Sequence, residues 1–392
     1  MKLLHTSDWH LGRNLFSVPL LDHQRVFLEW LIAQVDEHQV DAVIISGDIY
    51  DRSVPAVETI SLFEWALIEL AKRTEVVLIP GNHDSATRLG FAGPLLEAAR
   101  VHVRASAADL ARPIILTART HERPQADDST QATDRVQIFC IPYLEPAFHS
   151  ANFDCERSHA GVLAAAMDQI RSAADLDLPI VVVSHAFITG GVASESERDV
   201  RVGGIPDAPV SIFQGANYVA LGHLHRPQAL STPDGMLARY SGSPIAYSFS
   251  EEGQVKSVVL LDISSLGAEV MLLPTPTPRP LSTIRGDLED LLNDPRWQEA
   301  QDHWIRAVVT DDRRPERPME RLRERFPHTL QLEFAPSNAL LTNEFRAVDI
   351  ATLDPVEVTS QFINYVAGIA ATDQELTLIE QAVERVRIAQ VQ

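Results

Sequence analysis

Residues 42–51 read AVIISGDIYD, an apolar run that gives way abruptly to two acidic side chains. Ala42–Ser46 is typical of a buried strand, because it is short and rich in isoleucine and valine. Gly47 and Asp48 follow where such a strand would end. Four other segments have the same build, and we predict a strand in each: Lys2–Thr6, Glu75–Ile79, Pro179–Ser184 and Tyr218–Leu221.

Helical segments lie between these runs. Asp22–His38 predicts one helix, and Pro55–Arg73 predicts another, with Ser53 near its N-cap and a proline in its first turn. Strands that alternate with helices predict an α/β domain whose functional loops lie beyond the strand ends. The apolar residues of the second helix exceed a single stripe, which indicates a second buried face: Ile60, Leu62, Phe63, Trp65, Leu67, Ile68 and Leu70.

The chain divides at a proline-rich linker. Residues 274–280 read PTPTPRP, which predicts a stiff connection after an N-terminal domain of residues 1–273. Within that domain, residues 119–135 are polar and aperiodic, and we expect an exposed loop there. Residues 281–336 predict a small βαβαβ domain, with these strands and helices: Leu281–Arg285, Asp287–Asn293, His303–Thr310, Pro318–Phe326 and Thr329–Phe334.

The C-terminal segment, residues 337–392, predicts two helices. The first starts at the capping box Asp354-Pro355-Val356-Glu357 and stops near Gly368. The second starts at Thr372, with Glu375 completing its capping box. This second helix has an apolar stripe that suits a partner helix better than simple tail packing: Leu376, Ile379, Val383 and Val386.

Composition indicates a cytoplasmic globular protein. The 392 residues exceed a typical single core, and the chain is 45% hydrophobic and 22% charged. We expect neither a signal peptide nor a membrane span, and the lone Cys140 and Cys155 favour a reducing compartment without disulfides. The net charge of −21 argues against simple electrostatic adhesion to DNA. Bound cations or a partner subunit would weaken that argument.

Polar clusters follow each of the five strands. They are Asp8-Trp9-His10, Gly47 to Asp51, Gly81-Asn82-His83-Asp84, Ser184-His185 and Gly222-His223-Leu224-His225. Carboxylates and imidazoles suit manganese, iron or zinc. Residues two apart in an extended segment face the same side, so Asp8 with His10, and His223 with His225, can each present two ligands. The glycines before Asp48, Asn82 and His223 would let the backbone turn sharply. One such cluster arises easily by chance; five together predict a metal centre.

These clusters, in this order, resemble those of the calcineurin-like metallophosphoesterase superfamily. The resemblance implies two facing β-sheets flanked by helices and two divalent metal ions. It assigns one ion to Asp8, His10, Asp48 and His225, and the other to Asp48, Asn82, His185 and His223, with Asp48 as the bridge. It makes His83 a catalytic residue that stabilises the phosphate or protonates the leaving oxygen, oriented by Asp51.

Longer stretches resemble the SbcD family of bacterial nuclease subunits, which process DNA double-strand breaks: His5–Gly12, Tyr218–Gln228 and Tyr240–Phe249. This resemblance implies a Mn²⁺-dependent 3′–5′ exonuclease on duplex ends and an endonuclease on single strands and hairpins. It also implies a homodimer contact on the Pro55–Arg73 helix, a DNA-capping role for residues 281–336 and docking of the C-terminal helices on the coiled coil of an SbcC-like ATPase.

Alternative functions stay open from the sequence. Gly47–Arg52, GDIYDR, also fits phosphoprotein phosphatases, so a phosphatase or phosphodiesterase acting on small phosphoesters is one alternative. A repair nuclease that needs no ATPase and a non-catalytic DNA-end scaffold are the others, although complete ligand positions argue against the scaffold. The arginines between Arg313 and Arg325 suit either a phosphate-contacting face or a solvated helix with ion pairs.

Overall fold

The computed structural model describes residues 1–119, 135–197, 208–232, 235–336, 354–367 and 370–391. The chain forms two compact units, Met1–Pro278 and Arg279–Gln392. Most of the expected loop at 119–135 and the expected helix stop at Gly368 lie outside the described residues.

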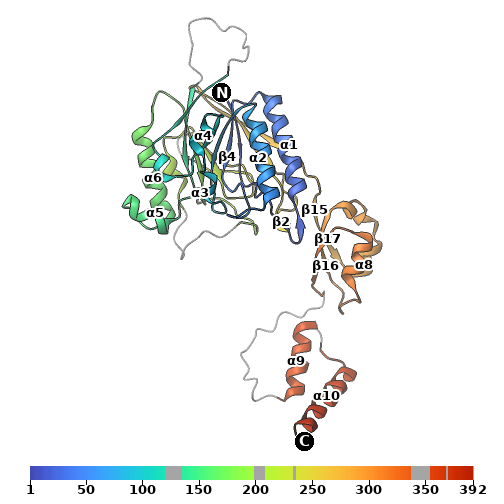
Figure 1. The fold of residues 1–392 in the computed structure, drawn as a ribbon. Helices are drawn as coiled ribbons and strands as arrows, with labels where there is room; N and C mark the ends of the chain where they lie inside the picture. Colours follow the sequence, from blue (N-terminus) through green and yellow to red (C-terminus); the bar gives the residue numbers. More distant parts are fainter. Residues whose placement is uncertain (120–134, 198–207, 233–234, 337–353, 368–369, 392) are drawn as a thin grey trace. The chain divides into compact units, whose positions relative to one another are not determined.

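The first unit contains two six-stranded sheets (Figure 1). In the first sheet the strand order is β14 (Gly267–Pro274), β13 (Ser257–Ser264), β1 (Lys2–Thr6), β4 (Ala42–Ser46), β5 (Glu75–Ile79) and β6 (Val101–Val103). In the second the order is β11 (Gln228–Ala229), β12 (Leu237–Tyr240), β10 (Tyr218–Gly222), β9 (Ile180–His185), β8 (Arg135–Ile141) and β7 (Ile114–Thr117). Parallel pairing joins β1, β4, β5 and β6 in one sheet, and β12, β10, β9 and β8 in the other.

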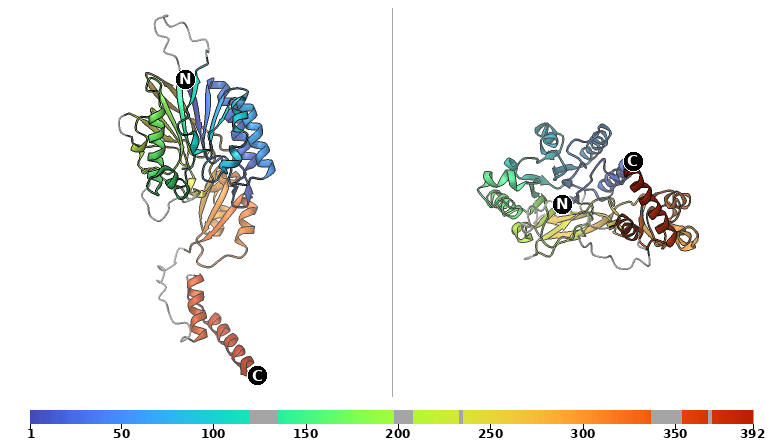
Figure 2. Two further views of the ribbon diagram at one scale, coloured as in Figure 1. Left: turned by 60° about the vertical axis from the view of Figure 1, so that its left-hand side comes forward. Right: turned by 90° about the horizontal axis from the view of Figure 1, so that it is seen from below.

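The two sheets face each other across a shared apolar layer. Leu3, Ile44 and Val77 of the first sheet and Val181 and Tyr218 of the second are buried in this layer. Helices α1 (Leu21–His38) and α2 (Val57–Ala71) cover the outer face of the first sheet, and α6 (His159–Ala173) covers that of the second (Figure 2). The central strands are therefore buried on both faces, which explains their continuous apolar runs. The expected architecture of two sheets flanked by helices is confirmed.

Shorter elements complete the first unit: β2 (Asn14–Leu15), β3 (Val18–Pro19), α3 (Ala86–Leu89), α4 (Gly93–Glu97) and α5 (Pro146–Phe153). All five predicted strands are present, within one residue of their predicted ends.

Helix α2 departs from its prediction in two respects. It begins at Val57 behind Ala56, which has no capping side chain, so the assignment of Ser53 to the cap region was wrong. Leu62, Phe63 and Leu70 are buried, whereas Ile60 and Ile68 are 43% and 50% exposed. The second apolar face is therefore not buried within the described part of this chain.

The second unit begins with a three-stranded parallel sheet of β15 (Leu281–Gly286), β16 (Trp304–Val309) and β17 (Thr329–Phe334). Helices α7 (Leu288–Asn293) and α8 (Pro318–Arg325) accompany it, and Ile284, Ile305 and Phe326 lie in its core. Arg321 pairs with Glu289, while Arg323 and Arg325 donate to main-chain carbonyls. The side chains of these three arginines therefore form ion pairs or hydrogen bonds with residues of the same domain.

Helices α9 (Pro355–Ala367) and α10 (Asp373–Val391) end the chain and contact each other. The predicted capping box at Thr372 is present: the Thr372 N–H donates to Glu375 over 2.7 Å, and the Glu375 N–H reaches the Thr372 hydroxyl at 3.4 Å. In the described part of the chain no helix is long and apolar enough to cross a membrane.

Candidate metal centre

The polar clusters meet where β1, β4 and β5 of one sheet and β9 and β10 of the other end. Main-chain hydrogen bonds join the first two loops: the Asp8 N–H donates to the Gly47 carbonyl and the His10 N–H to the Asp48 carbonyl, each over 3.0 Å. Asp84 joins the third loop to the second, because its carboxylate accepts from the N–H groups of Ile49, Tyr50 and Gly81 at 2.9–3.0 Å. The strand ends therefore hold the loops in one connected network.

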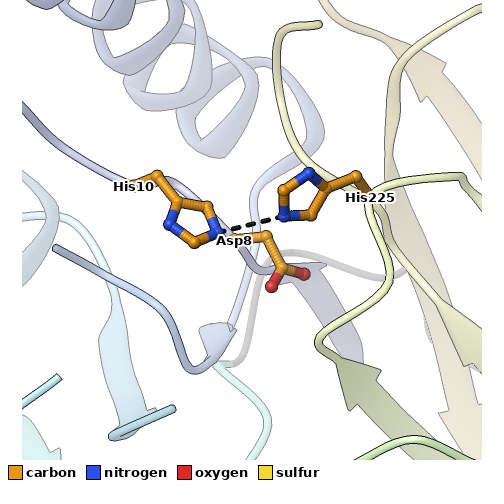
Figure 3. Close-up of side chains that lie close together, drawn as sticks. All are labelled: Asp8, His10 and His225. Carbon is orange, nitrogen blue, oxygen red and sulfur yellow. Dashed lines mark hydrogen bonds between the residues drawn. The ribbon is translucent and has the colours of Figure 1, made fainter. Parts of the chain in front are cut away.

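The first ligand group consists of Asp8, His10 and His225, all buried (Figure 3). Donor atoms of the three side chains lie within 4.8 Å of one another. His10 Nε2 and His225 Nε2 approach to 3.1 Å. The predicted convergence of Asp8 with His10 therefore occurs.

The second ligand group consists of Asp48, His185 and His223. His185 Nε2 lies 3.4 Å from Asp48 Oδ2. Asn82 joins this group, because its Oδ1 lies 3.0 Å from His185 Nε2 and 3.1 Å from His223 Nδ1. Asp48 Oδ2 also lies 3.6 Å from His10 Nε2, so this carboxylate lies between the two groups.

The backbone conformation of the ligand-bearing loops differs from the predicted extended one. Asp8, His10, Asp48 and His223 have φ values of 54°, 42°, 49° and 110°, a range that side-chain-bearing residues rarely adopt. The loops are therefore not extended, and the expected two-residue alternation does not explain the pairing. Such strain costs roughly 1–3 kcal/mol per residue and persists only where surrounding contacts enforce it.

Glycines make room for the centre in two ways. Gly47 has φ +91°, which agrees with the predicted sharp turn. Gly81 and Gly222 have no positive φ. A Cβ at Gly81 would lie 2.2 Å from Asp48 Oδ1, and one at Gly222 would lie 2.0 Å from the Ser46 carbonyl oxygen. These two positions need glycine because of close approach, not because of a turn.

Burial and mutual charge set the protonation of the centre. Burial raises the pKa of Asp8 to about 6. Burial also opposes ionisation of Asp48, but His185 and His10 outweigh it and hold the pKa of Asp48 well below its usual value. Burial lowers the pKa of His223 to about 3 and that of His10 well below its usual value. For His185 the Asp48 charge outweighs burial and raises the pKa to about 9.

The donor set fits divalent cations. His185 Nδ1 lies 2.8 Å from the Ser46 carbonyl, which can only accept, so Nδ1 carries a proton and Nε2 faces the Asn82 and Asp48 oxygens. The Nδ2 of Asn82 has no hydrogen-bond partner among the described residues. The raised pKa of His185 keeps a proton on Nε2 that donates to these oxygens, and a cation bound between the same atoms would displace that proton.

His83 lies beside both groups. Its Nδ1 lies 2.8 Å from the main-chain carbonyl of Asp51. The Asp51 carboxylate instead lies 3.6 Å from His10 Nδ1 and 3.6 Å from Arg13 Nη1. His83 also comes within 4.8 Å of His10 and Asp48 donor atoms, so proximity alone does not separate it from the ligands.

A depression of about 620 Å³ opens next to His83. Its lining includes two arginines and one aromatic ring that is 51% exposed, Phe16. The lining residues are Arg13, Asn14, Phe16, Asp51, Arg52, Ser53, Asn82 and His83.

Sequence reasoning missed several residues that shape the centre. Asp84 belongs to the polar cluster Gly81–Asp84, and its position in that cluster was the sequence signal for a role at the centre. Gln24 of α1 donates to the carbonyls of Trp9 and His10 and accepts from the Gly12 N–H. Ser196 contacts His225 from a segment between strands. No motif marks these last two, because their roles depend on tertiary contacts.

Comparison with known families identifies the first unit. Residues 1–227 match the calcineurin-like phosphoesterase family, over more than half of the chain. The chain belongs to the calcineurin-like phosphoesterase family. Residues 277–366 match the SbcD C-terminal domain, described as the type 5 capsule protein repressor C-terminal domain. Together these two domains make the chain a calcineurin-like phosphoesterase of the SbcD type.

Three solved structures to which this phosphoesterase is similar have little sequence identity to it. The protein TT1561 of Thermus thermophilus is 11% identical over 69% of this chain and 98% of its own, with a TM-score of 0.39. An archaeal phosphodiesterase is 14% identical over 70% of this chain and 100% of its own, with a TM-score of 0.30. GAP50, the anchor in the inner membrane complex of Plasmodium, is 10% identical over 70% of this chain and 84% of its own, with a TM-score of 0.41.

The family assignment fixes the general chemistry. The fold normally binds two divalent metals, and this chain has the matching groups of candidate ligands. It is therefore a metal-dependent phosphoester hydrolase.

Proposed function

We propose that this chain is the Mn²⁺-dependent nuclease subunit of an ATPase-coupled complex that processes DNA breaks. It would act as a 3′–5′ exonuclease on duplex ends and as an endonuclease on single strands and hairpins. One observation carries the proposal: two buried ligand groups share Asp48 in a chain whose second unit matches the SbcD C-terminal domain.

The proposed ligand scheme follows the two groups. Asp8, His10 and His225 would hold one cation, and Asn82, His185 and His223 the other, with Asp48 contributing to both. Two bound divalent cations activate water for attack and stabilise the charge that develops on the phosphate.

His83 would act on the phosphate or the leaving oxygen. Its Nδ1 proton is engaged by the Asp51 carbonyl, so Nε2 is the ring nitrogen that remains to exchange a proton. His83 lines the depression, and this supports a role beside bound substrate. Arg13 and Arg52 would contact backbone phosphates there, and the exposed Phe16 ring would stack on a base.

Partner surfaces are proposed from exposed apolar residues. Ile60 and Ile68 on α2 would form a homodimer contact. On the C-terminal helices, Phe362 and Leu378 are 62% and 64% exposed, and these helices would dock on the coiled coil of an SbcC-like ATPase. The domain of residues 281–336 would cap bound DNA. Two free cysteines suit the proposed cytoplasmic location.

The test is a comparison of substrates. Purified protein with Mn²⁺ is incubated with an end-labelled duplex, a hairpin and an aryl phosphate, with and without a co-expressed coiled-coil ATPase. We expect cleavage of both DNAs, faster duplex processing with ATPase and ATP, and no cleavage by Asp48→Asn. Preferential hydrolysis of the aryl phosphate would indicate a phosphatase, and DNA binding without cleavage a scaffold.

A further inference from the structure

His225 differs from other imidazoles of the centre in how its outer nitrogen is held. Main-chain carbonyls fix His185 and His83 through Nδ1, those of Ser46 and Asp51 respectively, each over 2.8 Å. For His225 the corresponding contact is a side chain, because Nδ1 lies 2.5 Å from the hydroxyl of Ser196. The orientation of His225 therefore depends on a residue that substitution can remove.

Ser196 is the first member of a buried chain of side chains. Its hydroxyl contacts the carboxylate of Glu251, and the Lys256 ammonium pairs with the other oxygen of that carboxylate. Ser196 is 8% exposed, Glu251 1% and Lys256 4%. Lys256 also donates to the main-chain carbonyl of His225 over 2.7 Å and to Ser243 Oγ over 3.0 Å.

The direction of the hydrogen bonds follows from this order. The Glu251 carboxylate, paired with the Lys256 ammonium, is ionised and can only accept. The single hydroxyl proton of Ser196 must therefore point to Glu251, and the Ser196 oxygen must accept from His225 Nδ1–H. Nε2 of His225 is then left without a proton, and it is the atom that faces His10 Nε2 at 3.1 Å.

The main chain around Ser196 is also tied to the centre. Glu197 accepts from the His225 N–H over 2.7 Å. Arg13, which lines the depression, donates to the Ser196 carbonyl over 2.7 Å. The segment that carries Ser196 is thus held against His225 on one side and against Arg13 on the other.

We propose that Ser196 and Glu251, supported by Lys256, are positioning residues for His225, and that they set the affinity of one of the two cation sites. This rests on the proposed metal centre. The relay keeps a proton on Nδ1, presents the Nε2 lone pair to the Asp8, His10 and His225 group, and makes the ring a better donor. The Asp48, Asn82, His185 and His223 group has no contact with Ser196 among the described hydrogen bonds, so its affinity should not depend on the relay.

The experiment is calorimetric titration of the full-length protein with Mn²⁺ alone. Wild type should bind two ions. Ser196→Ala and Glu251→Gln should each weaken one site about 10- to 100-fold and leave the other unchanged, as expected for loss of an outer hydrogen-bond partner. Ser196→Thr, which keeps the hydroxyl, should restore the affinity. Electron paramagnetic resonance gives a second readout. At one added equivalent of Mn²⁺ the two variants should show the signal of an isolated ion, whereas the coupled pair should appear only at saturation.

Ser184→Ala is the matched control. Ser184 is a buried serine next to His185, and its hydroxyl has no hydrogen-bond partner among the described residues. Its removal should leave both affinities unchanged. Two unaltered sites in folded Ser196→Ala and Glu251→Gln, or an equal loss at both sites, would overturn the positioning role. A wild-type protein that binds fewer than two ions would instead refute the proposed metal centre, so the two failures are distinguishable.

Discussion

His83 donates a hydrogen bond from Nδ1 to the main-chain carbonyl of Asp51, 2.8 Å away. The family resemblance assigned Asp51 the task of orienting His83, and the contact exists, but the carboxylate takes no part in it. Any residue at position 51 that preserves the backbone retains the contact. The roles of the two residues are therefore separable by substitution.

Replacement of His83 by alanine should abolish most cleavage and leave two Mn²⁺ ions bound. The proposed proton exchange at Nε2 would be lost, and a positioned acid or base contributes roughly 10²- to 10⁴-fold to the rate. Calorimetry and single-turnover cleavage of a hairpin measure the two effects independently. A variant that binds only one ion would show that His83 is a ligand, as its proximity to His10 and Asp48 allows.

Asp51→Asn should retain the orientation of His83 and lose much less activity than His83→Ala. The substitution keeps the backbone carbonyl and removes only the charge near His10 and Arg13. Cleavage rates of both variants on the same substrate, at saturating Mn²⁺, provide the measurement. Equal losses would mean that the carboxylate itself acts in the reaction.

Asp48→Ala should lose both cations, because Asp48 lies against His10 of one group and His185 of the other. His10→Ala should weaken mainly one site. The metal content of each variant after gel filtration distinguishes loss of both ions from loss of one, and thermal melting verifies that each variant is folded. Retention of a full metal complement by folded Asp48→Ala would disprove the bridging role.

Much of the centre was predictable because its residues follow strands. Asp8, Asp48, Asn82, His185 and His223 each come at or just beyond the end of an apolar run, and parallel strands bring such ends together. The second sheet itself came from family resemblance, since its strands β7, β8, β11 and β12 had not been recognised from their patterns.

What the sequence could not supply are contacts set by tertiary packing. Ser196 meets His225 through a tertiary contact between two loops, and Glu251 and Lys256 complete the relay from beyond the last strand of the second sheet. Likewise, the positive φ angles of Asp8 and Asp48 result from loop-to-loop hydrogen bonding and have no local sequence signal. Local patterns predict where a loop begins, whereas its path depends on its neighbours.

The two cysteines should differ in reactivity. Both are free; burial raises the pKa of Cys140 to about 12, and burial together with Asp154 and Glu156 raises that of Cys155. Only the thiolate reacts, so a raised pKa lowers the reactive fraction at pH 8. Iodoacetamide should modify the partly exposed Cys155 slowly, and faster as the pH rises, and should reach Cys140 only after unfolding. Peptide mass spectrometry measures both; labelling of Cys140 in the folded protein would contradict its burial.

The C-terminal helices should serve a partner and not catalysis. Both sheets of the first unit form from residues within 1–274, and none of the proposed ligands lies beyond His225. Truncation after Leu353 should therefore leave Mn²⁺-dependent cleavage of single strands almost intact. It should abolish co-purification with the ATPase and any ATP dependence of duplex processing.

The energy for that association would come from the apolar residues of α10. Burying an exposed Leu, Ile or Val contributes roughly 1.5–3 kcal/mol before ordering costs are subtracted. Of the predicted stripe, Val386 is exposed, whereas Leu376, Ile379 and Val383 are already half-buried and would contribute less. Leu378 and Val386, 64% and 56% exposed, offer a sharper test than truncation. Leu378→Glu with Val386→Glu should prevent ATPase capture, whereas Glu380→Gln, at another exposed position of α10, should not. Capture by the truncated chain would move the contact elsewhere. A truncated protein that is folded but inactive would mean that the tail completes the active site.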